Sequence, residues 1–266
     1  MNEKKVAVVT GGTSGIGRAT ALALKDAGCT VYELSRRAEG VEGLHHISAD
    51  VTDESAVNDA VAQVIAAEGQ IDILVNNAGF GISGAIEFTS TTDARSLFDV
   101  NFFGMVNMNR AVVPLMRAAG HGRIVNLSSV AAPVPIPFQA YYSATKAAVN
   151  AYTMALANEL RPFGVTVCAV MPGDIHTGFT AARRKLSEGD DIYQGRISRS
   201  VVRMEHDEQT GMDPAKAGAY IAKVALRSGS NHPLYAIRFD YKFFAFLAKV
   251  LPAGFLNWLI YLLYGK

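Results

Sequence analysis

The sequence predicts an α/β fold, with one domain built on a doubly wound parallel sheet that is flanked by helices. Short apolar runs alternate with helical patterns along most of the chain, which is typical of parallel strands joined by crossover helices. The connections are short, and no linker rich in glycine, proline or serine divides the chain. Half of the 266 residues are hydrophobic, so the chain can form one large core.

Strands are expected at the apolar runs, which lie at residues 6–10, 30–35, 44–49, 71–76, 123–127 and 165–170. Helices are expected from the turn after the first strand to about Ala27, and over residues 54–68, 92–118 and 141–161. The helix over 92–118 contains Gly104 and Pro114, so we expect a bend near one of them. The main domain should therefore span residues 1–240, and an apolar helical extension should follow over 241–266.

The composition excludes several classes of function. The formal net charge is +1, which gives no reason to expect a nucleic acid as partner. Cys29 and Cys168 lie in apparent strands without metal-type spacing, so we expect buried thiols in a reducing, cytoplasmic compartment. No signal peptide is expected, because residues 1–5 run directly into a strand pattern. The histidines show no ligand spacing, so no metal site is expected.

The first expected strand ends in a glycine-rich turn, Thr10-Gly-Gly-Thr-Ser-Gly-Ile-Gly17. Glycines in such a turn allow a tight bend, close approach of the backbone to a pyrophosphate, and close packing of helix on strand. The helix that begins near Ile16 would direct its free N–H groups and its dipole at the phosphates. Because the turn joins strand to helix, it predicts a Rossmann-type dinucleotide site that includes Gly11, Thr13, Ser14, Gly15, Ile16 and Gly17.

The end of the second expected strand indicates which nucleotide binds. An acidic residue at this place commonly holds the ribose hydroxyls of NAD, but here the strand ends in Ser35, Arg36 and Arg37. Two guanidinium groups suit the 2′-phosphate of NADP(H), although an arginine pair at a strand end can also be merely solvated. We therefore expect NADP(H) as the preferred cofactor, with NAD(H) as the alternative. Asp50 and Val51 could meet the adenine, or Asp50 could cap the next turn.

A tyrosine and a lysine in the helix expected at 141–161 indicate acid–base chemistry. Tyr142 and Lys146 are four residues apart, so they lie on one face of the helix, one turn from each other. A neighbouring ammonium favours phenolate, so we expect it to lower the tyrosine pKa from its ordinary value of about 10. A general acid or base that works near neutral pH needs such a shift. For this spacing alone, an exposed helix face without function is the alternative.

Together these motifs resemble those of the short-chain dehydrogenase/reductase family over residues 5–177. Besides the glycine turn and the Tyr142–Lys146 pair, the chain contains the family's NNAG motif at residues 76–79 and its PGxxxT motif at residues 172–177. The resemblance implies a catalytic tetrad at Asn101, Ser129, Tyr142 and Lys146. It also implies further cofactor contacts at Asn77, Ala78, Gly79, Pro172, Gly173, Ile175 and Thr177, besides those of Tyr142 and Lys146.

For such a tetrad, the resemblance implies an enzyme that interconverts a ketone or aldehyde and an alcohol. Ser129 would hold and polarise the carbonyl oxygen, and Tyr142 would deliver the proton in reduction and remove it in oxidation. Lys146 would tune the tyrosine and hold the nicotinamide ribose, while Asn101 would position a water that links Lys146 to solvent. The cofactor supplies the hydride.

The segments around this expected site favour a small lipophilic substrate. Residues 130–138 are apolar and stiffened by prolines, so they predict a pocket wall, although a packed loop would look similar. The polar segment 178–213 has balanced charges, which favours a solvated lid over a dedicated anion site. Family members with apolar C-terminal tails act on steroids, retinoids or acyl lipids.

The tail of this chain is apolar on nearly every side from Phe255 to Tyr264, so it should not face water. Its apolar runs are too short to span a membrane. It could be an anchor on a membrane surface, a contact between subunits of a homodimer or homotetramer, or a cap over the substrate mouth. We expect an attachment or assembly element, outside the catalytic machinery, because every motif residue lies at or before Thr177.

Three other functions stay open at this point. A 3-oxoacyl thioester reductase of fatty-acid metabolism would use the same tetrad on another substrate. A non-catalytic NADP(H) sensor would not need the Tyr142–Lys146 pair, and a membrane-associated scaffold would depend on the tail. Turnover with a panel of carbonyl compounds separates the enzymes from the other two classes.

Overall fold

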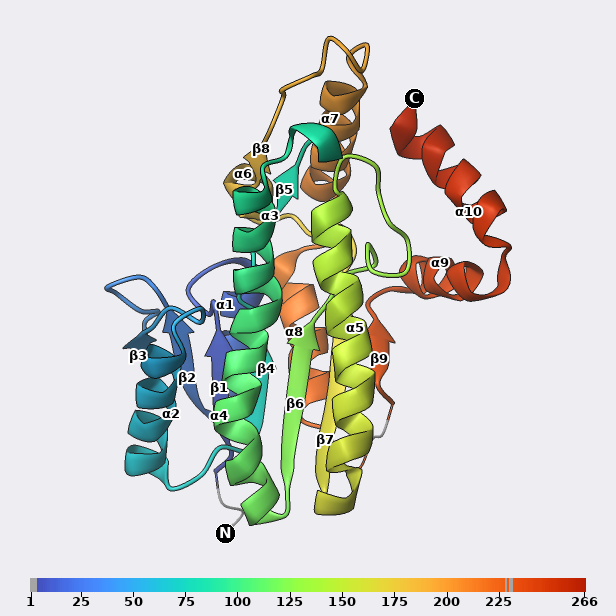
Figure 1. Cartoon of the computed structure of the whole chain (residues 1–266). Coiled ribbons are helices and arrows are strands. Elements are labelled where there is room, and N and C mark those ends of the chain that lie inside the picture. Colours follow the sequence, from blue (N-terminus) through green and yellow to red (C-terminus); the bar gives the residue numbers. More distant parts are fainter. Residues whose placement is uncertain (1–3, 228, 230–231) are drawn as a thin grey trace.

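The fold is a twisted parallel sheet with helices packed on both faces (Figure 1). The computed structural model describes residues 4–227, 229 and 232–266. The main sheet has the strand order β3-β2-β1-β4-β6-β7-β9, and neighbouring strands are parallel throughout. Its strands are β1 (Val6–Thr10), β2 (Thr30–Ser35), β3 (His45–Ser48), β4 (Ile73–Asn76), β6 (Gly122–Leu127), β7 (Val165–Met171) and β9 (Leu234–Ala236). The doubly wound architecture predicted from the sequence is confirmed.

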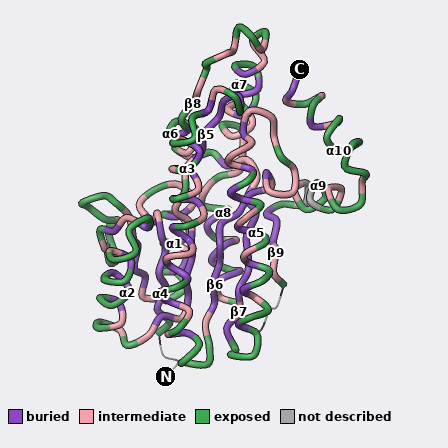
Figure 2. The backbone as a smooth tube through the Cα atoms, in the orientation of Figure 1, coloured by how far each residue is buried: buried purple, intermediate pink, exposed green. Residues whose placement is uncertain are grey.

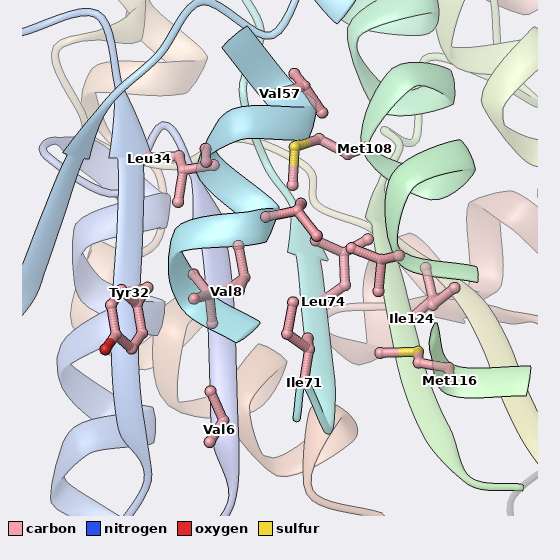
Figure 3. Packing of buried hydrophobic residues seen from close by; sticks show 14 of the residues in the cluster. Val6, Val8, Tyr32, Leu34, Val57, Ile71, Leu74, Met108, Met116 and Ile124 are labelled. Carbon is pink, nitrogen blue, oxygen red and sulfur yellow. The ribbon is translucent and has the colours of Figure 1, made fainter. Parts of the chain in front are cut away.

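Each face of the sheet buries its own apolar cluster. Val8 and Leu74 point to one face, where they pack with Met108 (Figure 3), whereas the next residues along their strands, Val9 and Val75, point to the other. This follows from the two-residue period of a strand, and Figure 2 shows the central strands β1, β4, β6 and β7 as almost entirely buried. The first face is covered by α2 (Glu54–Glu68), α4 (Gly104–Ala119) and α5 (Ala140–Leu160), and the second by α1 (Gly15–Asp26) and α8 (Pro214–Ala225).

The long helix expected at 92–118 is interrupted. Helix α3 (Thr91–Phe98) passes into a π-helical turn over Asp99–Phe103, and α4 then continues through Pro114 without a break. The irregular turn therefore comes directly before Gly104, one of the two positions expected to bend. A Cβ atom at Gly104 would lie 2.5 Å from Val51 Cγ2, so glycine allows the start of α4 to pack closely on the segment after β3.

The second half of the chain contains elements that sequence periodicity did not resolve. The polar segment 178–213 holds α6 (Phe179–Ala182), α7 (Arg196–Gln209) and β8 (Arg184–Lys185), and β8 pairs with β5 (Ile82–Ser83). Short 3-10 turns lie at Ile86–Phe88 and Arg161–Phe163. The chain ends in α9 (Phe239–Val250), α10 (Ala253–Ile260) and a π-helical turn over Tyr261–Gly265 (Figure 1). None of the helices in the described ranges is long and apolar enough to cross a membrane.

Candidate active site

A cavity of about 780 Å³ lies at the carboxyl ends of β1, β2, β4, β6 and β7. The chain crosses from one side of β1 to the other between β3 and β4, and doubly wound sheets bind their ligands at such a reversal of strand order. All the cofactor and catalytic residues predicted from the sequence line this cavity, except Gly17 and Asn101. The fold therefore brings together residues that are more than 150 positions apart in the sequence, such as Gly11 and Thr177.

The glycine-rich turn has the geometry that a phosphate-binding backbone needs. Gly11 and Gly15 have φ values of 64° and 53°, in the left-handed region that favours glycine. Helix α1 begins at Gly15, and its N-cap residue Ser14 makes no side-chain capping bond, so the first N–H groups of the helix are available to an anion. A Cβ atom at Gly17 would lie 2.3 Å from both Asn77 Nδ2 and Gly11 O. Gly17 thus acts through packing behind the cavity wall.

The NNAG segment is tied to the first strand by hydrogen bonds. The Thr10 hydroxyl accepts from the backbone N–H groups of Asn77 and Ala78, each at 3.0 Å. The Asn77 side chain donates in turn to Thr10 O at 3.0 Å. These bonds fix the ends of β1 and β4 relative to each other at the reversal of strand order, where Asn77, Ala78 and Gly79 line the cavity.

At the end of β2, two arginines line the cavity, whereas the acidic residue of the strand, Glu33, does not. Arg36 and Arg37 line the cavity, and the Arg36 side chain is 76% exposed, with only a loose 3.9 Å contact to Asp50. Glu33 is fully buried and bonded to His46 Nδ1 at 2.5 Å, so it does not reach the cavity wall. The buried Ser35 hydroxyl has no hydrogen-bond partner among the described residues. These groups fit a nucleotide ribose that carries extra negative charge.

Asp50 caps the turn after β3, and its contact with the adenine stays a prediction. It lines the cavity beside Val51, and its Oδ1 atom also accepts from the N–H and the hydroxyl of Thr52, at 2.9 and 2.8 Å. The carboxylate therefore caps the turn after β3 while it faces the nucleotide end of the cavity.

Tyr142, Lys146 and Ser129 meet at the centre of the cavity. Tyr142 and Lys146 lie in the first two turns of α5, with Lys146 Nζ 5.6 Å from the centroid of the tyrosine ring. Ser129 follows β6 and lines the cavity near the Tyr142 phenol, whose pKa it lowers. The Lys146 amine donates to Leu127 O at 2.8 Å, which fixes the lysine against the end of β6.

The expectation that Lys146 lowers the pKa of Tyr142 is wrong for this structure. Burial raises the pKa of the Tyr142 phenol to about 12, and this effect exceeds the lowering by the Ser129 hydrogen bond and by the charge of Arg183. Burial also lowers the pKa of Lys146 to about 8. Both shifts have one cause, because a water-poor environment penalises phenolate and ammonium alike.

Asn101 lies behind the cavity wall rather than on it. It belongs to the π-helical turn and is 2% exposed, with its Oδ1 atom accepting from Phe80 N and its Nδ2 atom donating to Phe80 O, both at 2.9 Å. A Cβ atom at Gly79 would lie 3.0 Å from Asn101 Oδ1 and 3.8 Å from Lys146 Nζ. Asn101 thus holds the backbone that follows Gly79, and its water link to Lys146 stays a prediction.

The far end of the cavity is built by segments that carry no recognised motif. Phe179 lies with its ring centroid 5.9 Å from that of Tyr142, and Met204 and Glu208 of α7 complete this wall. Glu208 is held in place, because it pairs with the buried Arg183 and accepts from the Thr180 hydroxyl at 2.6 Å. The polar segment 178–213 therefore covers this end of the cavity.

The C-terminal extension reaches the same end at two places. The Tyr241 hydroxyl donates to Asp174 Oδ2 at 2.7 Å and accepts from Asp174 N at 2.9 Å. The Tyr264 hydroxyl donates to Asp207 Oδ2 at 3.1 Å, and Tyr264 lines the cavity. Between these contacts, Trp258 is 52% exposed. The tail therefore contributes to the cavity wall and also presents apolar side chains to solvent.

Comparison with known proteins identifies the family. The model of the short chain dehydrogenase family matches residues 5–188. The chain belongs to this family. A relative named 3-ketodihydrosphingosine reductase, from Bacteroides thetaiotaomicron, is 41% identical over 228 residues, which cover 85% of each chain.

Solved structures with a similar fold agree with this assignment. A short-chain dehydrogenase from Streptomyces avermitilis has a TM-score of 0.83 at 34% identity, over 97% of this chain and 94% of that one. ElxO with NADP bound has a TM-score of 0.75 at 27% identity, over 90% and 99% of the chains. A 3-ketoacyl-(acyl-carrier-protein) reductase from Brucella melitensis in complex with NADH has a TM-score of 0.74 at 26% identity, over 88% and 96%. The protein is therefore an oxidoreductase of CH–OH or C=O groups that uses a nicotinamide cofactor.

Several residues that line the cavity of this dehydrogenase could not be found from its motifs. The family motifs mark the cofactor and the proton donor, but they say nothing about the wall made by Phe179, Met204, Glu208 and Tyr264. The apolar spacing of Ile197, Val201 and Met204 is the signal that could have located α7. No local signal could have placed Tyr264 at this wall, because its contact with Asp207 spans 57 positions.

Proposed function

We propose that this enzyme uses NADP(H) to interconvert a ketone and an alcohol on a lipophilic, long-chain substrate. The observation that carries the proposal is the position of Ser129 and Tyr142 at a cavity whose wall continues into apolar side chains. Val130, Ile136, Phe179 and Met204 all line the cavity, and they suit an alkyl chain that lies next to the reacting carbonyl.

Each residue of the site has its own role in the reduction. The bound cofactor supplies a hydride to the carbonyl carbon. The Ser129 hydroxyl donates a hydrogen bond to the carbonyl oxygen, and the Tyr142 phenol gives its proton to that oxygen as the alcohol forms. With a pKa of about 12, the Tyr142 phenol is protonated at neutral pH, which is the state that proton donation in reduction requires. Lys146 lies one helical turn away, where it would hold the ribose of the nicotinamide.

The preference for NADP(H) is supported by the end of β2. Arg36 and Arg37 are the cationic side chains that line this part of the cavity. Glu33 is bonded to His46 and does not line it. A 2′-phosphate would gain charge-assisted hydrogen bonds here, whereas the ribose hydroxyls of NAD would find no acid from β2.

The class of substrate is supported by the wall of the cavity and by the relative from Bacteroides thetaiotaomicron, whose name gives 3-ketodihydrosphingosine as its substrate. The C-terminal extension adds exposed apolar side chains near the same end, among them Phe243, Phe246 and Phe255. We infer that these residues rest on a membrane surface, from which a lipid could enter, or pack between the subunits of a homodimer or homotetramer.

Steady-state kinetics with a carbonyl panel tests the proposal. The panel contains a long-chain 3-ketone, a ketosteroid, retinal and a 3-oxoacyl thioester, each with NADPH and with NADH. We expect the highest kcat/KM for the long-chain ketone with NADPH. A clear preference for the thioester would assign the enzyme to 3-oxoacyl reduction. Tight nucleotide binding without turnover of any compound would assign it to the sensors.

A further inference from the structure

We propose that His46 is a positioning residue that fixes the backbone at Arg37, so that the two arginines after β2 are preorganised for the 2′-phosphate of NADP(H). This role rests on the proposed preference for NADP(H), and His46 itself does not line the cavity. Residues 36–44 join β2 to β3 without forming a helix or strand, and those from Arg36 to Gly40 are exposed. Side chains on such a segment keep one position only if its backbone is tied to the rest of the fold.

His46 forms a bridge between the buried part of β2 and the segment that carries the arginines. Its Nδ1 atom lies 2.5 Å from Glu33 Oε1, and its Nε2 atom lies 3.0 Å from Arg37 O. The register of the sheet sets the first contact, because Glu33 and His46 are directly opposite each other in the parallel pair of β2 and β3. Within the described ranges, the bond to Arg37 O is the only hydrogen bond that joins residues 36–40 to another segment of the chain.

The two partners of His46 determine where its protons lie. A carbonyl oxygen such as Arg37 O can only accept, so Nε2 must carry a proton and donate it. Nδ1 and Glu33 Oε1 then share one further proton between imidazole and carboxylate. Turning the ring over would place carbon atoms opposite both acceptors, so the bridge is satisfied in one orientation of the imidazole. The backbone at Arg37 is therefore held in one place relative to β2.

Glu33 holds the bridge from its buried side. The residue is fully buried, and its second oxygen, Oε2, has no hydrogen-bond partner among the described residues. A buried carboxylate needs a bonded partner, and His46 is that partner. A Cβ atom at Gly12 would lie 2.5 Å from Glu33 Cβ, and one at Gly40 would lie 2.4 Å from His46 Cβ. The glycine-rich turn and the arginine segment therefore both pack closely against this pair of side chains.

A fixed backbone at Arg37 favours NADP(H) over NAD(H). Arginine side chains that bind a phosphate lose rotamer freedom, and the total loss is smaller where the backbone that carries them is already held. NAD(H) has no 2′-phosphate, so it gains nothing from having the two guanidinium groups in place. Loss of the bridge should thus weaken NADPH selectively, whereas general damage to the nucleotide site would weaken both nucleotides alike.

Fluorescence titrations with NADPH and NADH at pH 7.5 measure this selectivity. In His46→Asn, the amide nitrogen takes the place of Nδ1 and can still bond to Glu33, but the side chain is too short to reach Arg37 O. We expect its Kd for NADPH to rise about tenfold, while its Kd for NADH stays within about twofold of wild type. In His46→Gln, the amide nitrogen takes the place of Nε2 and can donate to Arg37 O, so most of the NADPH affinity should return.

His45→Asn is the matched control. His45 precedes His46 in β3, but its ring stacks on Tyr32 with 4.6 Å between the centroids, on the opposite face of the sheet. Both Kd values of this control should stay within about twofold of wild type. The double variant Glu33→Met/His46→Leu removes the whole bridge without leaving a buried charge unpaired, and it should show the same selective loss as His46→Asn.

A further titration shows whether His46 acts through the arginines. In a chain that already carries Arg36→Ala and Arg37→Ala, adding His46→Asn should weaken NADPH by less than about twofold, because the groups that the bridge positions are gone. Equal losses of both nucleotides, an unchanged NADPH Kd in the folded variants, or a full tenfold loss on top of the arginine replacements would overturn the role of His46. A wild-type enzyme that binds NADPH no more tightly than NADH would instead contradict the proposed cofactor preference itself.

Discussion

Lys146→Met should make the nucleotide-free protein more stable at neutral pH, although it removes a member of the tetrad. Lys146 is 5% exposed, and burial lowers its pKa from 10.5 to about 8. No aspartate or glutamate oxygen among the described residues lies within 4.0 Å of its amine, which donates to the neutral Leu127 O. The site therefore holds an ammonium that its surroundings do not compensate, and the folded state loses free energy to keep it.

The size of this loss follows from the two pKa values. Because the folded-state pKa is depressed, the unfolded chain binds more protons between about pH 8 and pH 10.5, and the free energy of unfolding rises with pH across this window. The charge costs the folded state about 3 kcal/mol at pH 7 and about 1 kcal/mol at pH 10. Methionine avoids this cost but gives up the bond to Leu127 O, worth about 1 kcal/mol. A net gain of about 2 kcal/mol should remain at pH 7, and it should vanish near pH 10.

Urea unfolding of wild type and variant at pH 7 and pH 10, followed by circular dichroism, measures both numbers. Lys223→Met on the exposed side of α8 is the control, and its difference from wild type should be a few tenths of a kcal/mol at both pH values. A Lys146→Met variant that is less stable than wild type at pH 7, or whose difference does not change with pH, would refute the reasoning that burial leaves this ammonium uncompensated.

Three further predictions concern the cofactor, the proton donor and the extension. Tyr142→Phe should lower kcat by at least a hundredfold while NADPH still binds, because the variant lacks the phenolic hydroxyl that donates the proton but keeps the ring; a near-normal kcat would show that Tyr142 is not the proton donor. Replacing Arg36 and Arg37 by alanine should weaken NADPH by tenfold or more and NADH by less than threefold in fluorescence titrations, and equal losses would contradict the 2′-phosphate site. Truncation after Pro252 should leave NADPH affinity nearly unchanged, because the predicted cofactor residues end at Thr177, but should reduce co-sedimentation with phospholipid vesicles or the oligomer size in light scattering. If both stay the same and only the KM of a long-chain ketone rises, the extension serves the substrate mouth alone.

The nucleotide half of the site could be predicted from the sequence because its geometry is set by local rules. Gly11 and Gly15 lie in one short turn, and their left-handed φ values are what glycine is needed for. Tyr142 and Lys146 are neighbours because a helix brings every fourth residue to the same face. The sequence also indicated a long helix before β6, but not that a π-helical turn would place Asn101 behind Gly79.

The sign of the tyrosine pKa shift could not be predicted in the same way. Spacing along a helix gives the distance between two charges, whereas the dielectric surroundings depend on how completely the rest of the chain covers them. Here Lys146 is almost fully buried, and the loss of hydration has a larger effect on both pKa values than the attraction between ammonium and phenolate that the spacing predicted. The pKa of a group can therefore be predicted from its neighbouring charges only when the burial of that group is already known.

The far end of the cavity follows even less from local rules, because its residues meet only through long-range packing. Tyr241 orients Asp174 across 67 positions, and Tyr264 reaches the cavity from the last turn of the chain. The motifs end at Thr177, so the reaction that they serve can be named without knowledge of the segments beyond that residue. The wall at the far end of the cavity is assembled from α6, α7 and the extension, which lie beyond Thr177 and can change without altering the residues predicted for hydride and proton transfer. This separation explains why one family fold can keep a single chemistry while its members act on different ketones and alcohols.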